Sequence, residues 1–217
     1  MRKWSVLVLW FFAFLSCRQI SESIDETINP VDSVADKQKL VTTVSTTTSA
    51  THSVVHQEGE NIGFLKDSVN LLRAEVLLTK LPQYAGKEIY VYSSASFFND
   101  GRIFIALQHP TNPKYVDNYQ YENGKWTGPK PEQLSVEDDI KDRLVPLSLM
   151  KFVNVARVYR NYNEKASDIE GAKPITHIYL SIWNNRVQWF PNSISGSRER
   201  YSIEFNIDGT LKSFKQV

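Results

Sequence analysis

The distribution of aromatic side chains divides this chain near residue 60. Residues 18–60 contain no Phe, Trp or Tyr, whereas residues 61–217 carry most of an aromatic fraction that is 12% of the whole chain. Large aromatic side chains contribute much of the area that a core buries, so the part after residue 60 is the part able to build one. Cys17 is the only cysteine, which excludes a disulfide within one chain. The fold must therefore be stabilised by the packing of its interior.

The first seventeen residues have the pattern of a secretory signal. Two basic residues precede an apolar run from Val6 to Leu15, and Ser16 and Cys17 follow it. The run has about ten residues, whereas a helix that spans a bilayer needs roughly twenty. We therefore predict that residues 1–16 are a signal peptide. A plain secretory signal with an uninvolved cysteine, or a short amino-terminal anchor helix, are the alternatives.

The end of this segment, Phe14-Leu15-Ser16-Cys17, resembles the lipobox of bacterial lipoproteins. The resemblance implies that the Cys17 thiol receives a diacylglycerol, that the signal is cut before Cys17, and that the new amino terminus is acylated, for example with palmitate. Each acyl chain contributes about 0.8 kcal/mol per buried methylene, so two or three chains hold a protein stably on a membrane. The implied location is the cell envelope, at the outer membrane, on its periplasmic or surface face.

Residues 17–60 are predicted to be a disordered tether. Residues 41–54, which read VTTVSTTTSATHSV, are mostly Ser and Thr. Such a segment cannot bury enough apolar surface to offset the conformational entropy that ordering would cost. We therefore expect the tether to join the lipid anchor to a folded part that begins near residue 61.

The charge balance bears on the class of partner. Removal of residues 1–16 takes two of the 25 basic residues, Arg2 and Lys3, and leaves 23 basic residues against 24 acidic ones. Binding to nucleic acid needs a basic excess or a basic stripe, because affinity comes largely from contacts with phosphates. The near-neutral mature chain therefore disfavours nucleic acid as the partner.

The first half of the folded part, residues 61–134, is predicted to be a helix followed by an antiparallel meander. Apolar residues predict an amphipathic helix over 64–81: Leu65, Val69, Leu72 and Val76 recur at helical spacing, and Leu71 and Leu78 lie slightly off phase. β-branched and aromatic runs predict strands at 88–93, 102–108 and 116–122. Asn123-Gly124 is a hairpin turn signal, and the return strand is expected to stop at Gly128-Pro129-Lys130-Pro131.

The second half, residues 135–217, repeats this order. Ser135 and Asp138 have the spacing of a capping box, which predicts a short helix to about Leu144. A longer helix is predicted over 147–165, because apolar residues again recur at helical spacing. The strands that follow are predicted at 175–183, 187–190, 200–207 and 211–216.

The two halves predict an α+β fold of two tandem helix-plus-antiparallel-meander repeats, with the helices on one face of the sheet. Ile89-Tyr90-Val91 in the first half corresponds to Ile178-Tyr179-Leu180 in the second. This order of elements resembles small envelope modules of the PepSY and beta-lactamase-inhibitor type, which implies a similar fold and no particular function. Chance similarity between two α+β halves is the alternative.

No constellation typical of an enzyme occurs in the sequence. His109 and His177 have no Asp or Ser nearby in a catalytic pattern, and Ser195 lacks the Gly-x-Ser-x-Gly frame of a nucleophile elbow. Asp138 and Asp139 could form a carboxylate pair, but the start of a capped helix explains them equally well. The prediction is a protein without catalytic residues, bound metal or cofactor.

A binding role is predicted from aromatic residues on the expected strands. Trp126 and Trp189 lie near hairpin ends and are candidate exposed anchors, and Tyr119 and Tyr121 are further candidate ligand contacts. Packing of both tryptophans across the seam between the halves is the alternative. The sequence thus predicts a lipid-anchored, non-catalytic envelope module that binds a protein or an envelope ligand. A structural accessory subunit of an envelope complex and an immunity or inhibitor protein are the alternative functions.

Overall fold

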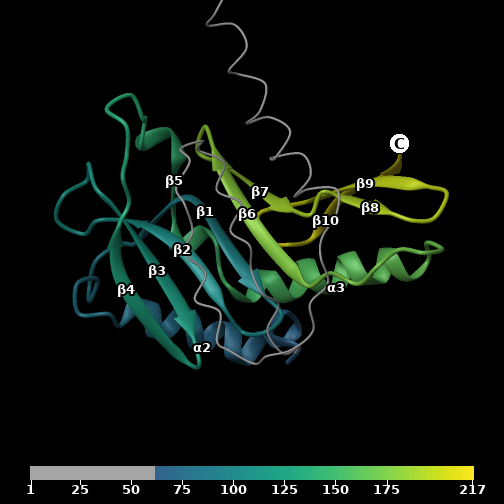
Figure 1. Cartoon of the computed structure of the whole chain (residues 1–217), viewed down its shortest axis with the longest axis horizontal. Coiled ribbons are helices and arrows are strands. Elements are labelled where there is room, and N and C mark those ends of the chain that lie inside the picture. Colours follow the sequence, from purple (N-terminus) through teal and green to yellow (C-terminus); the bar gives the residue numbers. More distant parts are fainter. Residues whose placement is uncertain (1–61) are drawn as a thin grey trace, which may run out of the picture. The chain divides into compact units, whose positions relative to one another are not determined.

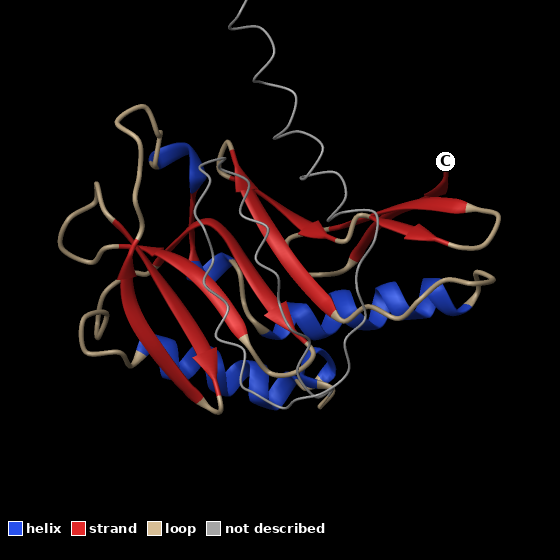
Figure 2. Ribbon diagram, viewed as in Figure 1, coloured by secondary structure: helices blue, strands red, loops and turns tan. Residues whose placement is uncertain are grey.

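The computed structural model describes residues 62–217. The predicted signal peptide, the predicted lipidation site Cys17 and the predicted tether lie outside the described residues. Residues 62–217 form an α+β fold in which helices pack against antiparallel sheets, which confirms the α+β part of the predicted fold class (Figures 1 and 2). In this part of the chain no helix is long and apolar enough to cross a membrane.

The larger sheet has seven strands and is antiparallel throughout. Six strands lie in the order β4-β3-β2-β1-β6-β7, and β5 pairs with the first part of β1. The strands are β1 (Tyr90–Phe98), β2 (Ile103–Gln108), β3 (Val116–Glu122), β4 (Lys125–Pro131), β5 (Leu144–Pro146), β6 (His177–Trp183) and β7 (Arg186–Phe190). Strand β1 therefore joins the two halves of the chain, because it pairs with β2 on one side and β6 on the other.

A smaller sheet of three strands follows at the carboxyl end, in the order β10-β9-β8. Its strands are β8 (Ser193–Ser195), β9 (Arg200–Phe205) and β10 (Leu211–Gln216). It lies beside the end of β7 and above the second helix (Figure 1). The predicted strand at 200–207 therefore belongs to a separate sheet.

Two α-helices, α2 (Ser68–Thr79) and α3 (Val153–Ser167), lie on one side of the larger sheet (Figure 1). The short 3-10 helices are η1 (Phe64–Lys66), η2 (Lys141–Arg143) and η3 (Leu147–Leu149). The core fills the space between the helices and this face of the sheet. Phe97 of β1 meets Phe152 at the start of α3 edge to face, with ring centroids 5.0 Å apart. Leu71, Ala74 and Leu78 of α2 contribute to the same core.

The beginnings of both helices are capped by acidic side chains. Asp67 accepts hydrogen bonds from the backbone N–H groups of Val69 and Asn70 at 3.0 Å each, and this stabilises α2. The hydrogen bond from the Asn70 backbone is the main cause that lowers the pKa of the Asp67 carboxyl. Glu75 of α2 is buried and accepts a hydrogen bond of 2.7 Å from the N–H of Phe152. Glu75 therefore caps α3 from the neighbouring helix.

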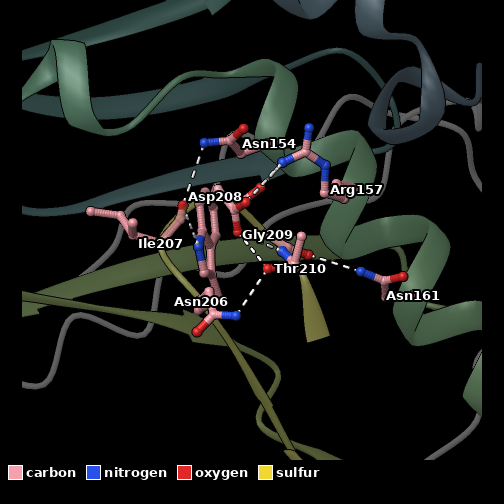
Figure 3. A network of polar contacts seen from close by, with 9 residues as sticks. Asn154, Arg157, Asn161, Asn206, Ile207, Asp208, Gly209 and Thr210 are labelled. Atoms are coloured by element: carbon pink, nitrogen blue, oxygen red, sulfur yellow. Dashed lines mark hydrogen bonds and ion pairs between the residues drawn. The ribbon is translucent and has the colours of Figure 1, made fainter. Parts of the chain in front are cut away.

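The turn between β9 and β10 is fastened to α3 by a network of polar contacts (Figure 3). Three side chains of α3 donate to carbonyl groups of the turn: Asn154 to Ile207 at 3.4 Å, Arg157 to Asp208 at 2.6 Å and Asn161 to Gly209 at 2.9 Å. Hydrogen bonds from Thr210 to the Asp208 side chain are the largest cause that lowers the pKa of this carboxyl. The network holds the small sheet against α3.

Several sequence predictions about the fold are wrong. The helix predicted over 147–165 begins only at Val153, after the single turn of η3. Residues 135–144 form turns and the single turn of η2 instead of a helix, although Ser135 N–H does donate to the Asp138 carboxylate at 2.7 Å. Strand β4 continues to Pro131 instead of stopping at Gly128, because an edge strand tolerates proline. Of the four apolar residues expected to share one face of the helix at 64–81, only Leu65 is buried. Val69, Leu72 and Val76 face outward, and the buried face of α2 is Leu71, Ala74 and Leu78.

Candidate functional site

Three of the four aromatic residues predicted to contact a ligand belong to the core. Trp189 is 1% exposed, so its prediction as an exposed anchor is wrong, and the candidate contacts Tyr119 and Tyr121 are also buried. The strand periodicity explains the tyrosines: they alternate with polar residues along β3 and therefore share its buried face. The Trp189 indole N–H donates to the Ile207 carbonyl at 3.2 Å, which leaves no polar atom of this side chain for a partner.

Trp126, the fourth candidate, is half-buried between the two halves of the chain. Its indole N–H donates to the Ala74 carbonyl of α2 at 2.8 Å. Its ring lies 5.2 Å from that of Tyr121 and 6.4 Å from that of Phe152, which belongs to the second half. Trp126 therefore packs across the seam, which was the alternative interpretation from the sequence.

The face of the larger sheet that points away from α2 and α3 carries a continuous row of aromatic rings. We call this row the aromatic ridge, and its members are Phe104, Phe98, His177, Tyr179 and Phe190. Cross-strand pairing of β2, β1, β6 and β7 places these rings next to one another. None of these five residues is among the ligand contacts predicted from the sequence.

The rings of the ridge stack on one another. Phe98 and His177 have centroids 4.2 Å apart and ring planes within 8°, and Tyr179 and Phe190 have centroids 4.7 Å apart and planes within 3°. Faces that are engaged with a neighbouring ring cannot also stack on a ligand. His177 and Tyr179, each stacked against two neighbouring rings, therefore offer a ligand no free ring face.

The hairpin between β6 and β7 presents a second aromatic feature at its tip. Asn184 and Asn185 connect the strands with φ values of 48° and 54°, as expected for a tight two-residue turn. Asn185 fixes this turn to the segment around η2: its N–H donates to the Asp142 carbonyl at 2.7 Å, and its side-chain amide donates to the Lys141 and Leu144 carbonyls at 2.7 and 3.1 Å. The tip of the β6–β7 hairpin is therefore fixed by hydrogen bonds to a segment that lies outside the hairpin.

Trp183 precedes the turn and is 61% exposed. The guanidinium carbon of Arg143 lies 4.7 Å from the centroid of the Trp183 ring, within the range of a cation–π interaction. Alternation along β6 places Ile178, Leu180 and Ile182 in the core, so Trp183 shares the open face with Tyr179. Trp183 is thus a large apolar side chain that is both exposed and held in place.

An acidic loop borders Trp183. Residues 132–142 extend into η2 and include five carboxylates, at Glu132, Glu137, Asp138, Asp139 and Asp142. Val136 in the same loop is fully exposed. Burial raises the pKa of the nearby Tyr92 phenol, Arg143 opposes this shift, and Asp138 adds to it, so both charged groups act on this phenol. We call Trp183, Arg143 and residues 132–142 the tip surface.

Residues 62–217 contain no group of three or more His, Cys, Asp or Glu side chains arranged to hold a metal ion. His109 accepts hydrogen bonds at Nδ1 from the N–H groups of Thr111 and Asn112, which stabilises its loop. His177 lies in the aromatic ridge.

Three comparisons with known proteins found no similar protein. No protein-family model, no curated protein and no solved structure matches this chain.

Proposed function

We propose that this protein is a lipid-anchored component of the cell envelope whose folded part is a non-catalytic module that binds a protein. The single observation that carries the binding role is Trp183, an exposed indole on a hairpin tip that is hydrogen-bonded to a neighbouring segment. Tryptophan is enriched among the residues that dominate the binding energy of protein interfaces. A side chain that is already held in place loses less conformational entropy when a partner binds.

The surroundings of Trp183 favour a protein over a sugar polymer. An apolar centre with a mixed-charge rim is the usual composition of a protein interface, and Arg143 and the carboxylates of residues 132–142 supply such a rim. In the aromatic ridge on the same face, His177 and Tyr179 offer ring edges because each stacks against two neighbouring rings. Both features suit contact with side chains of a partner.

The lipid anchor in this proposal rests on the sequence. Cys17 follows a short apolar run and is the only cysteine, as in the lipobox that this segment resembles. We expect the wild-type protein to partition into detergent with the mass of a diacylated or triacylated chain that begins at Cys17. The Cys17→Ala variant should remain in the aqueous phase because it has no acceptor for the diacylglycerol. Intact mass spectrometry measures the mass of each protein, and detergent partition shows the phase in which it is found. Wild-type protein that remains in the aqueous phase would contradict the lipid anchor.

The internal duplication is also a proposal. Each half has one helix followed by a meander, and the first strands of the two meanders, β1 and β6, pair antiparallel at the centre of the larger sheet. Residues 61–134 would be the first repeat and residues 135–217 the second. The repeats would differ after their second strands, because the second meander continues into the small sheet.

An immunity or inhibitor role is the second candidate. The observation that favours it is the exposed acidic loop beside Trp183, since inhibitors often oppose a basic surface with carboxylates around an apolar anchor. In this case the partner would be a toxin or an enzyme, and the same tip surface would make the contact.

Site-specific photocrosslinking tests the binding role. A photoreactive benzoyl-phenylalanine in place of Trp183, in the full chain and in the cells that produce it, should give one discrete adduct that is identified by mass spectrometry. The same group in place of Gln216, at the end of β10, is the matched control and should not give that adduct. Identical adducts from both positions, or none from position 183, would argue against the tip surface as the binding site.

A further inference from the structure

Helix α2 has an apolar face that the fold does not bury. Val69, Leu72 and Val76 are 77%, 48% and 39% exposed, and they lie one turn apart along the helix. The opposite face carries Leu71, Ala74 and Leu78, which are fully buried in the core. A surface helix normally has a polar outer face, so α2 is unusual in being apolar on both sides.

The basic side chains next to this apolar face are exposed as well. Lys66 precedes α2, Arg73 lies within it and Lys80 is its last flanking residue. None of the three has a carboxylate within 4.0 Å among residues 62–217, where the ion pairs involve other residues. Together with the three apolar residues they form what we call the outer face of α2.

The acidic residues of this helix do not reach its outer face. The Asp67 carboxylate is engaged with the N–H groups of Val69 and Asn70 and with the Asn70 amide. The Glu75 carboxylate is buried and accepts from the N–H of Phe152. The outer face therefore combines exposed apolar side chains with positive charge only.

We infer that the outer face of α2 binds the surface of an anionic lipid bilayer. Basic side chains beside apolar ones on one helical face are typical of helices that lie in the membrane interface, because the cations approach anionic headgroups while the apolar side chains enter the boundary region. A bilayer surface needs no complementary groove, which suits an apolar helical face that is exposed from Val69 to Val76. This inference depends on α2 alone and is independent of the function proposed for Trp183.

Such binding would orient the folded part. In Figure 1, α2 lies along one side of the described residues and the tip of the β6–β7 hairpin lies at the opposite side. With α2 on the bilayer, the tip surface would face away from the membrane. Trp183 would then be accessible to a partner while the protein remains at the membrane.

Vesicle sedimentation tests the inference without the lipid anchor. The chain that begins at residue 17 and carries Cys17→Ala excludes both the apolar leader and the acyl chains. We expect it to bind vesicles of phosphatidylcholine with about one third phosphatidylglycerol at least ten times more tightly than vesicles of phosphatidylcholine alone. Binding should weaken as salt is added, because surface charges are screened.

Two pairs of substitutions separate the outer face of α2 from general electrostatics. Arg73→Gln with Lys80→Gln should weaken binding to the anionic vesicles at least tenfold, and so should Val69→Ser with Val76→Ser. Lys125→Gln with Lys130→Gln removes two exposed charges from β4 and should change binding less than twofold. All of these side chains are exposed, and far-ultraviolet circular dichroism checks that each variant is folded.

The inference is overturned if the anionic vesicles are not bound, if both vesicle types are bound equally, or if the β4 pair weakens binding as much as the α2 pair. If the anionic vesicles are not bound, an acidic protein surface would remain as the candidate partner of the outer face of α2. Crosslinking at position 183 does not involve α2. The proposal that the tip surface binds a protein and the inference that α2 binds a bilayer can therefore fail independently.

Discussion

Gly209→Ala is expected to lower the free energy of unfolding by about 3 kcal/mol. Gly209 has a φ of 80°, which disfavours any residue with a Cβ atom. A Cβ at this position would also lie 2.5 Å from the carbonyl oxygen of Asn154, which is backbone of α3 and cannot move aside as a flexible side chain would. The substitution should therefore push the β9–β10 turn away from α3 and break the contacts that fasten the small sheet (Figure 3).

Gly124→Ala is the matched control for this prediction. Gly124 has a φ of 77° in the β3–β4 turn, and a Cβ there would meet no atom within 4 Å. Its replacement should lower the free energy of unfolding by only about 1 kcal/mol, which is the cost of holding a residue with a Cβ atom at this positive φ. Urea unfolding of both variants measures the difference between them. Equal losses would mean that the turn is not packed against α3 as described.

Trp189→Ala should lower the free energy of unfolding by about 3–5 kcal/mol. The Trp189 side chain is fully buried, it fills space between β7 and the turn after β9, and its N–H is bonded to Ile207. Truncation to Ala leaves a cavity and an unpaired carbonyl. The expected loss is among the largest that a single substitution in this chain would give.

Trp183→Ala provides the contrast. This indole is mostly exposed, so its removal should cost no more than about 1 kcal/mol, most of which is the cation–π contact with Arg143. Thermal and urea unfolding of the two variants distinguish a core tryptophan from a surface one. A large loss for Trp183→Ala together with a small loss for Trp189→Ala would contradict the placement of both residues.

Much of the fold could be predicted because strand patterns are local. The bounds predicted for β3 and β10 agree with the structure, and the hairpin turn at Asn123-Gly124 joins β3 to β4 as expected. The division of the strands between two sheets could not be predicted. It depends on how β7 and β9 meet, which is a contact between segments that no local pattern specifies.

The buried face of α2 was wrongly predicted for a physical reason. Its sequence, SVNLLRAEVLLT, offers apolar residues on two faces, so periodicity alone does not show which face meets the sheet. Glu75 lies on the buried face, where its hydrogen bond to Phe152 offsets the cost of burying a carboxylate. Only the tertiary structure shows that contact.

The candidate contacts could have been chosen better from alternation along the strands. In β3 the tyrosines alternate with Asn118, Gln120 and Glu122, and in β7 Trp189 alternates with Arg186 and Gln188. Side chains opposite a polar series face the core, so both patterns indicated buried aromatics. The same alternation in β6 sets Trp183 opposite its aliphatic residues. Its fixation by Asn185 and Arg143 depends on contacts with residues about forty positions earlier in the chain.

The affinity of the partner captured at position 183 is the most direct test of the central claim that the tip surface is the binding site. With that partner purified, calorimetry should show that Trp183→Ala weakens binding at least thirtyfold, which corresponds to about 2 kcal/mol for a residue that dominates an interface. Asp168→Asn with Glu170→Gln, at the far end of α3, should leave the affinity unchanged. A Trp183→Ala variant that binds within threefold of the wild type would contradict the account.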